Sequence, residues 1–286
     1  MIKIKTKIYA LVKVWLPIFL TPILVFLFLN KSGSYLTSSI LQLLFGLEKK
    51  DLIIEMCSYL NTSISLILSF VIILQILSIV RKKNSEQLFN ANGNIYYEHW
   101  YVTFWLASKI LGFRKIQLAG IPVGMQFKLV LRGTFPEIIE DVWGDHYESV
   151  SDGALRADEE TVKVEKLNMD LLNECFNVNL LICDTYPIEV NQISNEFKHN
   201  PTIIVSSTVN KEQLRYLNKP LVNEVRKSLK LIARDKNIYV FSTANSKNNL
   251  NIITSCFRFF DRFPIKNVYV VQYGKDKKYR KAIKVI

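Results

Sequence analysis

The sequence predicts an N-terminal two-helix transmembrane hairpin followed by a cytoplasmic α/β domain, Rossmann-like and with a mainly parallel sheet. Two long apolar runs, Ile8–Leu29 and Leu60–Val80, open the chain. A helix of about 20 apolar residues crosses the ~30 Å hydrocarbon core of a bilayer. The sequence after Arg81 is polar and mixed, and between Val178 and Gln272 short apolar runs alternate with helical patterns. This alternation is typical of parallel strands joined by crossover helices.

Basic residues lie at the two outer ends of the predicted hairpin, residues 1–83. They are Lys3, Lys5, Lys7, Lys13, Arg81, Lys82 and Lys83. The positive-inside rule therefore places both termini and the soluble domain in the cytoplasm of a multi-pass membrane protein. Lys13 falls inside the first run but near its start, where its ammonium group would snorkel to the interface. A signal peptide is disfavoured, because no Ala-x-Ala-like cleavage site follows and a second span comes soon after.

The composition favours a single soluble domain with anionic partners. The chain has 286 residues and a net charge of +12, and the part of the chain after the hairpin is the size of one domain. A basic balance suits nucleotides, nucleic acid or phospholipid headgroups, although lysines at membrane ends also contribute to it. The cysteines form no Cys-x-x-Cys pair and the histidines are far apart. We therefore expect a reducing cytoplasm, no metal site and no cofactor.

The segment 84–113 reads as a linker and an aromatic juxtamembrane helix. Ser85–Asn94 is polar, and Tyr96–Phe113 is rich in aromatic residues and contains Gly112, which would end a helix. Its aromatic residues suit either the membrane interface or a protein core. The predicted sensor-like domain, 114–286, then opens with two expected strands, Ile116–Ala119 and Met125–Arg132, around a glycine turn.

The middle of the domain is acidic, and the end is regular. Pro136–Glu160 is rich in carboxylates and turns, which indicates a solvated face because no histidine or nucleophile motif accompanies it. A strand is expected at Thr161–Leu167. The remaining expected strands are 178–183, 202–205, 238–241 and 268–272, and the expected helices are 219–236 and 250–263. Ligands of such sheets bind beyond the carboxyl ends of the strands, where this chain carries small hydroxyl and amide residues.

Motifs of common enzymes are missing from the sequence. It contains no Gly-x-x-x-x-Gly-Lys-[Ser/Thr], no Gly-x-Gly-x-x-Gly, no Gly-x-Ser-x-Gly and no His-Glu-x-x-His. A binding domain without catalytic residues is therefore the favoured interpretation over an enzyme.

The end of the chain resembles a known family. It reads Asn237-Ile-Tyr-Val-Phe-Ser-Thr-Ala-Asn245, a helix, Val-Tyr-Val-Val-Gln-Tyr, and then Tyr279-Arg-Lys-Ala-Ile283. This resembles the last βαβ unit of SAVED domains, which are relatives of CARF domains. Tyr239 stands where the family often has histidine, Asn245 replaces a proline, and Gln272-Tyr273 lies near the family's Tyr-Glu. The resemblance covers roughly the last fifty residues, and the family's mid-helix glycine is absent.

This resemblance implies a two-transmembrane SAVED effector of a cyclic-oligonucleotide anti-phage (CBASS) system. A partner nucleotidyltransferase would make the cyclic oligonucleotide, and the domain would bind it, form a homo-oligomer and disrupt the lipid bilayer. Residues at the predicted strand ends would then hold the ligand. They are Ser206, Ser207, Thr208, Ser242, Thr243, Asn245 and Lys275. Each of them also suits an ordinary strand-end loop.

Two other functions remain open at this point. A membrane-tethered nucleic-acid-binding component of a conjugation or replication apparatus is favoured by the basic residues around Tyr279. They are Lys275, Lys277, Lys278, Arg280, Lys281 and Lys284. A membrane enzyme acting on lipid or cell-wall precursors is the third, but the sequence supplies no chemistry for it.

Overall fold

The computed structural model describes residues 2–45, 51–92, 95–139, 148–149, 162–208, 216–232, 235–258, 267–274 and 276–286. The chain divides into two compact units. The first comprises Met1–Phe89 and Val102–Arg114, and the second comprises Asn90–Tyr101 and Lys115–Ile286.

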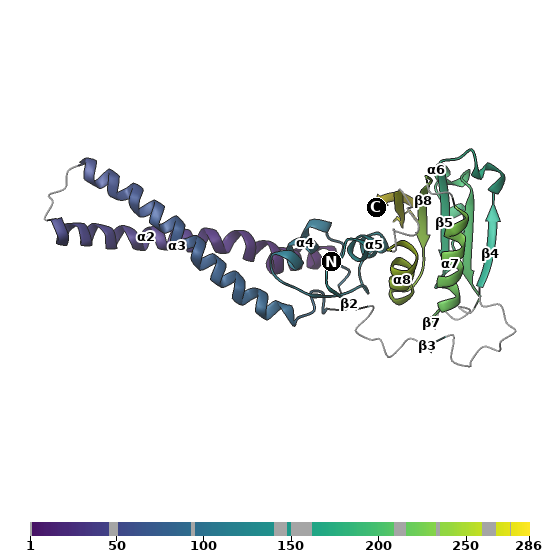
Figure 1. Cartoon of the computed structure of the whole chain (residues 1–286), viewed down its shortest axis with the longest axis horizontal. Helices are drawn as coiled ribbons and strands as arrows, with labels where there is room; N and C mark the ends of the chain where they lie inside the picture. Colours follow the sequence, from purple (N-terminus) through teal and green to yellow (C-terminus); the bar gives the residue numbers. More distant parts are fainter. Residues whose placement is uncertain are drawn as a thin grey trace. The chain divides into compact units, whose positions relative to one another are not determined.

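The first unit is built on two long antiparallel segments of helix (Figure 1). The first segment consists of α1 (Ile2–Ala10), a π-helical turn η1 (Leu11–Trp15) and α2 (Leu16–Phe45), and the second is α3 (Asp51–Ser85). Thr6–Lys31 and Ser58–Ser85 are long and apolar enough to cross a membrane. Within the most apolar 18-residue stretch of each helix, only 6% and 11% of the residues are buried. A core helix of a soluble protein would be mostly buried. The two predicted spans are therefore present as helices that expose apolar surface.

Polar side chains join the two spans along one seam. The Asn61 amide Nδ2 donates to the backbone oxygen and to Oδ1 of Asn30, both at 3.2 Å. Ser65 and Ser69 follow Asn61 at four-residue spacing and are buried as well. Small and amide side chains at such a seam let helices approach closely and bond to each other in lipid.

Lys13 lies in a cage of aromatic rings at the base of the first span. Its Nζ is 4.9 Å from the ring centroids of Tyr9 and Phe113 and 5.6 Å from that of Phe89. It also donates to the Phe89 carbonyl oxygen at 2.8 Å. Single π-helical turns inside α-helices, such as the one around Lys13, occur frequently at functional sites. The sequence placed this lysine at the membrane interface but did not indicate these partners.

Gly112 follows α4 and packs closely against Arg81 of α3 within the first unit. It has φ +79°, and a Cβ at this position would lie 2.8 Å from the Arg81 Cα, so only glycine fits. The Asn84 amide donates to the Leu111 carbonyl in the same region at 2.9 Å. Helix α4 (Tyr101–Lys109) precedes this turn and is shorter than the helix predicted over 96–113.

The second unit contains a six-stranded sheet with the order β10-β9-β8-β5-β6-β4. The strands are β4 (Val162–Leu167), β5 (Asn177–Cys183), β6 (Thr202–Ser207), β8 (Asn237–Ser242), β9 (Asn267–Tyr273) and β10 (Tyr279–Lys284). The four central strands are parallel, while β4 and β10 pair antiparallel at the edges. The sheet is thus mixed around a parallel centre. Strand β10 escaped prediction because its mostly exposed, lysine-rich sequence looks like a solvated terminus.

Each face of the sheet has its own core. Leu180 and Ile182 of β5 face α5 (Val123–Leu131), α7 (Lys219–Leu231), α8 (Ser246–Ile252) and the π-helical turn η5 (Ile253–Phe257). Leu181 and Cys183 face the other side, with α6 (Asn195–Lys198) and the 3-10 turn η4 (Val190–Gln192) nearby. This alternation follows from the two-residue period of a strand. Figure 1 shows α7 lying along the strands of this sheet.

The prediction of a strand at 125–132 was wrong, because this segment is helix α5. Its apolar and polar residues alternate in part, but the buried positions include Gln126, Phe127, Leu129 and Val130, which share one helix face. Pro122 stands just before the first turn, where proline is compatible with a helix.

Short pairs of strands complete the described part of the second unit. They are the parallel pair β1 (Lys115–Gln117) and β2 (Glu137–Ile139) and the parallel pair β3 (Glu148–Ser149) and β7 (Tyr216–Leu217), and a 3-10 turn η3 (Met169–Leu172) precedes β5. Most of the acidic region 136–160 lies outside the described residues. The helix predicted over 219–236 ends at Leu231, and the described part of the one predicted over 250–263 ends at Phe257.

Candidate functional site

Helices α5, α7 and α8 begin at the carboxyl edge of the parallel strands. Asn218, the N-cap of α7, bonds to Ser207 at the end of β6. Asn245, the N-cap of α8, bonds to the residue that comes directly after β5. At the start of α5, a Cβ on Gly124 would lie 3.3 Å from the Gln272 amide near the end of β9. Helix N-termini carry partial positive charge and unsatisfied N–H groups, so this edge favours anions.

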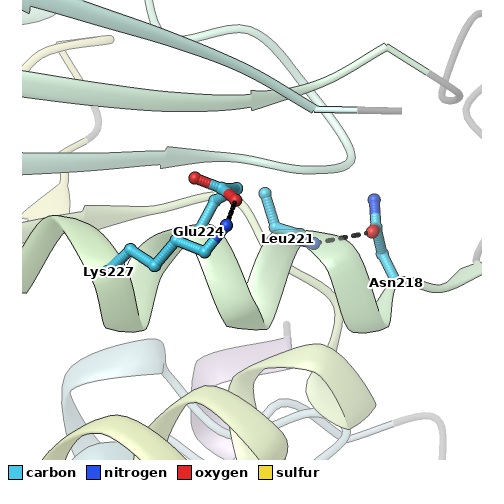
Figure 2. Close-up of polar contacts among 4 residues, drawn as sticks. All are labelled: Asn218, Leu221, Glu224 and Lys227. Carbon is cyan, nitrogen blue, oxygen red and sulfur yellow. Dashed lines mark hydrogen bonds and ion pairs between the residues drawn. The ribbon is translucent and has the colours of Figure 1, made fainter. Parts of the chain in front are cut away.

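The N-terminus of α7 is built around the buried side chain of Asn218, shown in Figure 2. Its Oδ1 accepts from the Leu221 N–H at 2.9 Å, and its Nδ2 donates to the Ser207 hydroxyl at 3.0 Å. Its own N–H donates to the Asn248 Oδ1 at 2.9 Å. Through its side chain and its backbone N–H, Asn218 thus links β6, α7 and α8, and this neutral cap adds no negative charge to the helix end.

Asp184 occupies the N-terminus of α8. Its carboxylate is 3% exposed and accepts from the Asn248 amide at 2.8 Å and from the Asn245 N–H and amide at 3.3 Å. Burial raises the pKa of this carboxyl, and the hydrogen bonds from Asn248 and Asn245 oppose that rise. Since α8 already faces an acidic side chain, an added anion is better placed at the ends of α5 and α7.

Most of the predicted site residues lie at this edge, but the side chains of several of them form hydrogen bonds within the domain. The Ser242 hydroxyl is buried and donates to the Asn249 Oδ1 at 2.9 Å. The Asn245 side chain is 9% exposed and caps α8 by accepting from the Asn248 N–H at 2.9 Å. The Thr243 hydroxyl donates to the Tyr186 carbonyl at 2.6 Å. These three side chains hold the loop after β8 in place.

The other predicted residues lie nearer the surface. Ser206 and Ser207 are half-buried at the end of β6, and Thr208 is exposed after it. The Ser206 hydroxyl lies against the Cys183 thiol, on the sheet face opposite α7. Lys275 lies outside the described residues.

Sequence reasoning passed over Asn218, Asp184 and Tyr273. Asn218 followed by Lys-Pro is a readable helix start, since asparagine is a favoured N-cap and proline suits the first turn. Asp184 directly follows an apolar strand, which is where functional carboxylates of parallel sheets occur. Tyr273 ends β9 half-exposed and was noted only as part of a family pattern.

Burial disfavours the described core thiols as nucleophiles. The nearest thiol, Cys183, has its pKa raised by burial, as does the core thiol Cys256, whose pKa reaches about 12. Such thiols are poor nucleophiles. Among the described residues, no three His, Cys, Asp or Glu side chains gather as a metal site would require. The described part of this edge presents hydroxyl and amide groups, the buried Asp184 carboxyl and positive helix ends.

Comparisons with known proteins give one match over the whole chain. The family described as SMODS- and Ubiquitin system-associated 2TM effector domain matches residues 1–286. Among solved structures, the chain is similar to Acinetobacter baumannii Cap4, a SAVED/CARF-domain containing receptor solved with the cyclic trinucleotide 3'3'3'-cAAA. The identity is 14%, the TM-score is 0.36, and the similarity covers 64% of this chain and 42% of that one, less than half its length. No curated protein matches the chain.

Proposed function

Since the chain belongs to the family of SMODS- and Ubiquitin system-associated 2TM effector domains, we propose that its α/β domain binds a cyclic oligonucleotide and thereby drives several copies to disrupt the membrane. The membership confirms the prediction of a two-transmembrane effector and makes the chain a membrane protein. Beyond this membership, we propose that the signal is a cyclic oligonucleotide, that several copies assemble and that they disrupt the bilayer.

The observation that carries the proposal is the carboxyl edge of the parallel strands. The starts of α5, α7 and α8 meet small polar side chains there. A cyclic oligonucleotide presents several phosphates and several bases on one compact ring. Helix N-termini favour the phosphates, and amide and hydroxyl groups bond to phosphate or base edges.

Within this proposal the predicted site residues divide into two groups. Ser206, Ser207, Thr208 and Lys275 contact the ligand. Ser242, Thr243 and Asn245 hold the loop after β8 in the conformation that the ligand meets, because their side-chain hydrogen bonds tie that loop to α8 and to Tyr186.

The peptide bond between Phe89 and Asn90 provides the route from the domain to the spans. Phe89 holds the caged Lys13 of the first unit. The fully buried Asn90 side chain bonds to both backbone groups of Gln117 in the second unit, at 2.7 and 2.9 Å, and the Gln117 amide returns a bond of 2.7 Å to the Asn90 carbonyl. Consecutive residues are thus each hydrogen-bonded within a different unit.

The membrane effect requires more than one copy. A single hairpin has too few helices to enclose a path for water, and the described outer surfaces of both spans carry large apolar side chains. The ligand must therefore favour the assembled state over the separate chains. We place both termini and the domain in the cytoplasm, in line with the basic residues at the outer ends of the hairpin.

Ligand-induced stabilisation tests the binding step. Full-length protein in detergent is heated with a panel of cyclic di- and trinucleotides, and linear nucleotides of the same composition serve as controls. A ligand at 100 times its Kd stabilises the native state by about 2.7 kcal/mol, which raises the melting temperature of a domain this size by roughly 5–10 °C. An unchanged melting temperature with every cyclic member of the panel contradicts the proposal.

A further inference from the structure

The turn between β9 and β10 is a well-formed hairpin at the carboxyl edge of the sheet. Tyr273 and Tyr279 pair across its base. The Gly274 N–H donates to the Lys278 carbonyl at 2.8 Å, and the Lys277 N–H donates to the Gly274 carbonyl at 3.2 Å. A Cβ on Gly274 would lie 3.3 Å from the Lys278 carbonyl oxygen, so the backbone of the turn packs closely at this residue. These bonds connect the described residues on the two sides of the turn.

A row of four aromatic side chains leads from the core to this hairpin. Phe197 and Phe241 lie 5.5 Å apart between ring centroids, Phe241 and Tyr279 lie 5.5 Å apart, and Tyr279 and Tyr273 lie 5.0 Å apart. Tyr279 is 5% exposed, whereas Tyr273 is 50% exposed. The buried rings therefore support Tyr273 from behind and leave half of its surface to a partner.

The same hairpin is basic. Lys277, Lys278 and Lys281 are exposed, and its acidic residue, Asp276, pairs with Arg280 at 2.9 Å. A supported aromatic ring with cationic side chains around it is the combination that binds nucleotides, because bases stack on the ring while the cations contact phosphates. Neither lipid headgroups nor an acidic peptide require the supported ring.

We propose that Tyr273 stacks on a base of the oligonucleotide ligand and that Lys277 and Lys278 contact its phosphates. The inference rests on the proposed function and extends it, because it assigns the base-binding position to the hairpin. Ser206, near the end of β6 on the same sheet face as Tyr273, then holds another part of the same ring.

The test compares the affinities of full-length variants in detergent for whichever cyclic di- or trinucleotide stabilises the wild type. Removing a stacked base contact costs about 10- to 100-fold in affinity. We expect this loss for Tyr273→Ala, and we expect Tyr273→Phe to bind within about threefold of wild type because the ring remains. Phe176→Ala is the matched control: Phe176 is 69% exposed but precedes β5, at the opposite end of the sheet.

The lysines give a second, independent readout. Each phosphate contact contributes to the decrease of log affinity with log salt concentration, by about 0.7 for single-stranded ligands. Lys277→Gln with Lys278→Gln should therefore reduce that slope by about 1.4, and this measurement stands even if Tyr273→Ala fails to fold. Unfolding curves without ligand show which variants fold.

The outcomes separate the two proposals. Wild-type binding with unchanged affinity in Tyr273→Ala and an unchanged salt slope in the lysine variant overturns the inference alone. A wild type that binds none of the cyclic panel overturns the proposed function and the inference with it. Tighter binding of linear single-stranded RNA or DNA through Tyr273 replaces the cyclic ligand with nucleic acid and overturns the inference as stated.

Discussion

Replacing Asn218 with alanine removes the cap of α7 and its link to β6 in one step. The buried Leu221 N–H loses its acceptor at 2.9 Å, and the Ser207 hydroxyl loses the amide at 3.0 Å. Losing an N-cap costs about 1 kcal/mol, and leaving a buried donor without a partner costs about 1–3 kcal/mol. These costs overlap, so we expect Asn218→Ala to reduce the free energy of unfolding by about 2–3 kcal/mol.

Glu224→Ala on the same helix is the matched control. Figure 2 shows the Glu224 carboxylate pairing with the Lys227 ammonium, at 2.5 Å, and both side chains are partly exposed to solvent. Exposed pairs at this spacing contribute about 0.3–0.5 kcal/mol. Asn218→Asp keeps the acceptor for the Leu221 N–H and should cost under about 1 kcal/mol.

The assay is thermal unfolding of the full-length protein in detergent, followed by near-ultraviolet circular dichroism. For a domain of this size 1 kcal/mol corresponds to about 2–4 °C, so Asn218→Ala should melt about 4–12 °C lower and Glu224→Ala within about 2 °C of wild type. Equal melting temperatures for the two alanine variants would refute the assignment of Asn218 as the residue that organises this edge.

Three further predictions concern Lys13, Asp184 and Gly112. Lys13→Met removes the cation and its bond to the Phe89 carbonyl, so backbone hydrogen exchange in 2–15 should accelerate in detergent; unchanged exchange would argue against the cage as an anchor. Burial raises the Asp184 pKa above 3.8, so the folded state holds this proton more tightly and stability falls as pH rises from 3.8 through the raised pKa. Asp184→Asn should abolish that decrease in unfolding curves recorded from pH 3.5 upward, and a persisting slope would assign it to another group. Gly112→Ala should reduce the free energy of unfolding by more than the roughly 1–2 kcal/mol of a left-handed alanine, because its Cβ meets Arg81. Gly133→Ala, at φ +53° with nothing within 4 Å of the new Cβ, should cost only that amount. Equal losses of stability in the two variants would contradict the close approach of Gly112 to Arg81.

Local patterns were enough to predict the spans and the parallel centre of the sheet. Each span is one long, mostly apolar run, and each central strand is a short, mostly apolar segment, so the residues of one element carry most of the signal. Local patterns did not predict strand β10 or helix α5. The first is an edge strand with one exposed face, and the second is a short helix whose sequence partly alternates.

The candidate site was predictable only in outline. Strand-end positions such as Ser207 and Thr243 follow from topology, because carboxyl ends of parallel strands share one edge. The partners of these residues come from distant segments, as with Ser242 and Asn249 or Asp184 and Asn248, and no spacing rule links them. The aromatic cage of Lys13 likewise joins residues 76 positions apart.

The most direct test of the central claim is leakage of a fluorescent dye from vesicles that contain the full-length protein. We predict that a cyclic oligonucleotide which raises the melting temperature also releases the dye, that linear nucleotides do not, and that protein lacking 1–83 releases none. Vesicles that stay sealed while the protein binds a cyclic oligonucleotide, or that leak equally without it, would contradict the account.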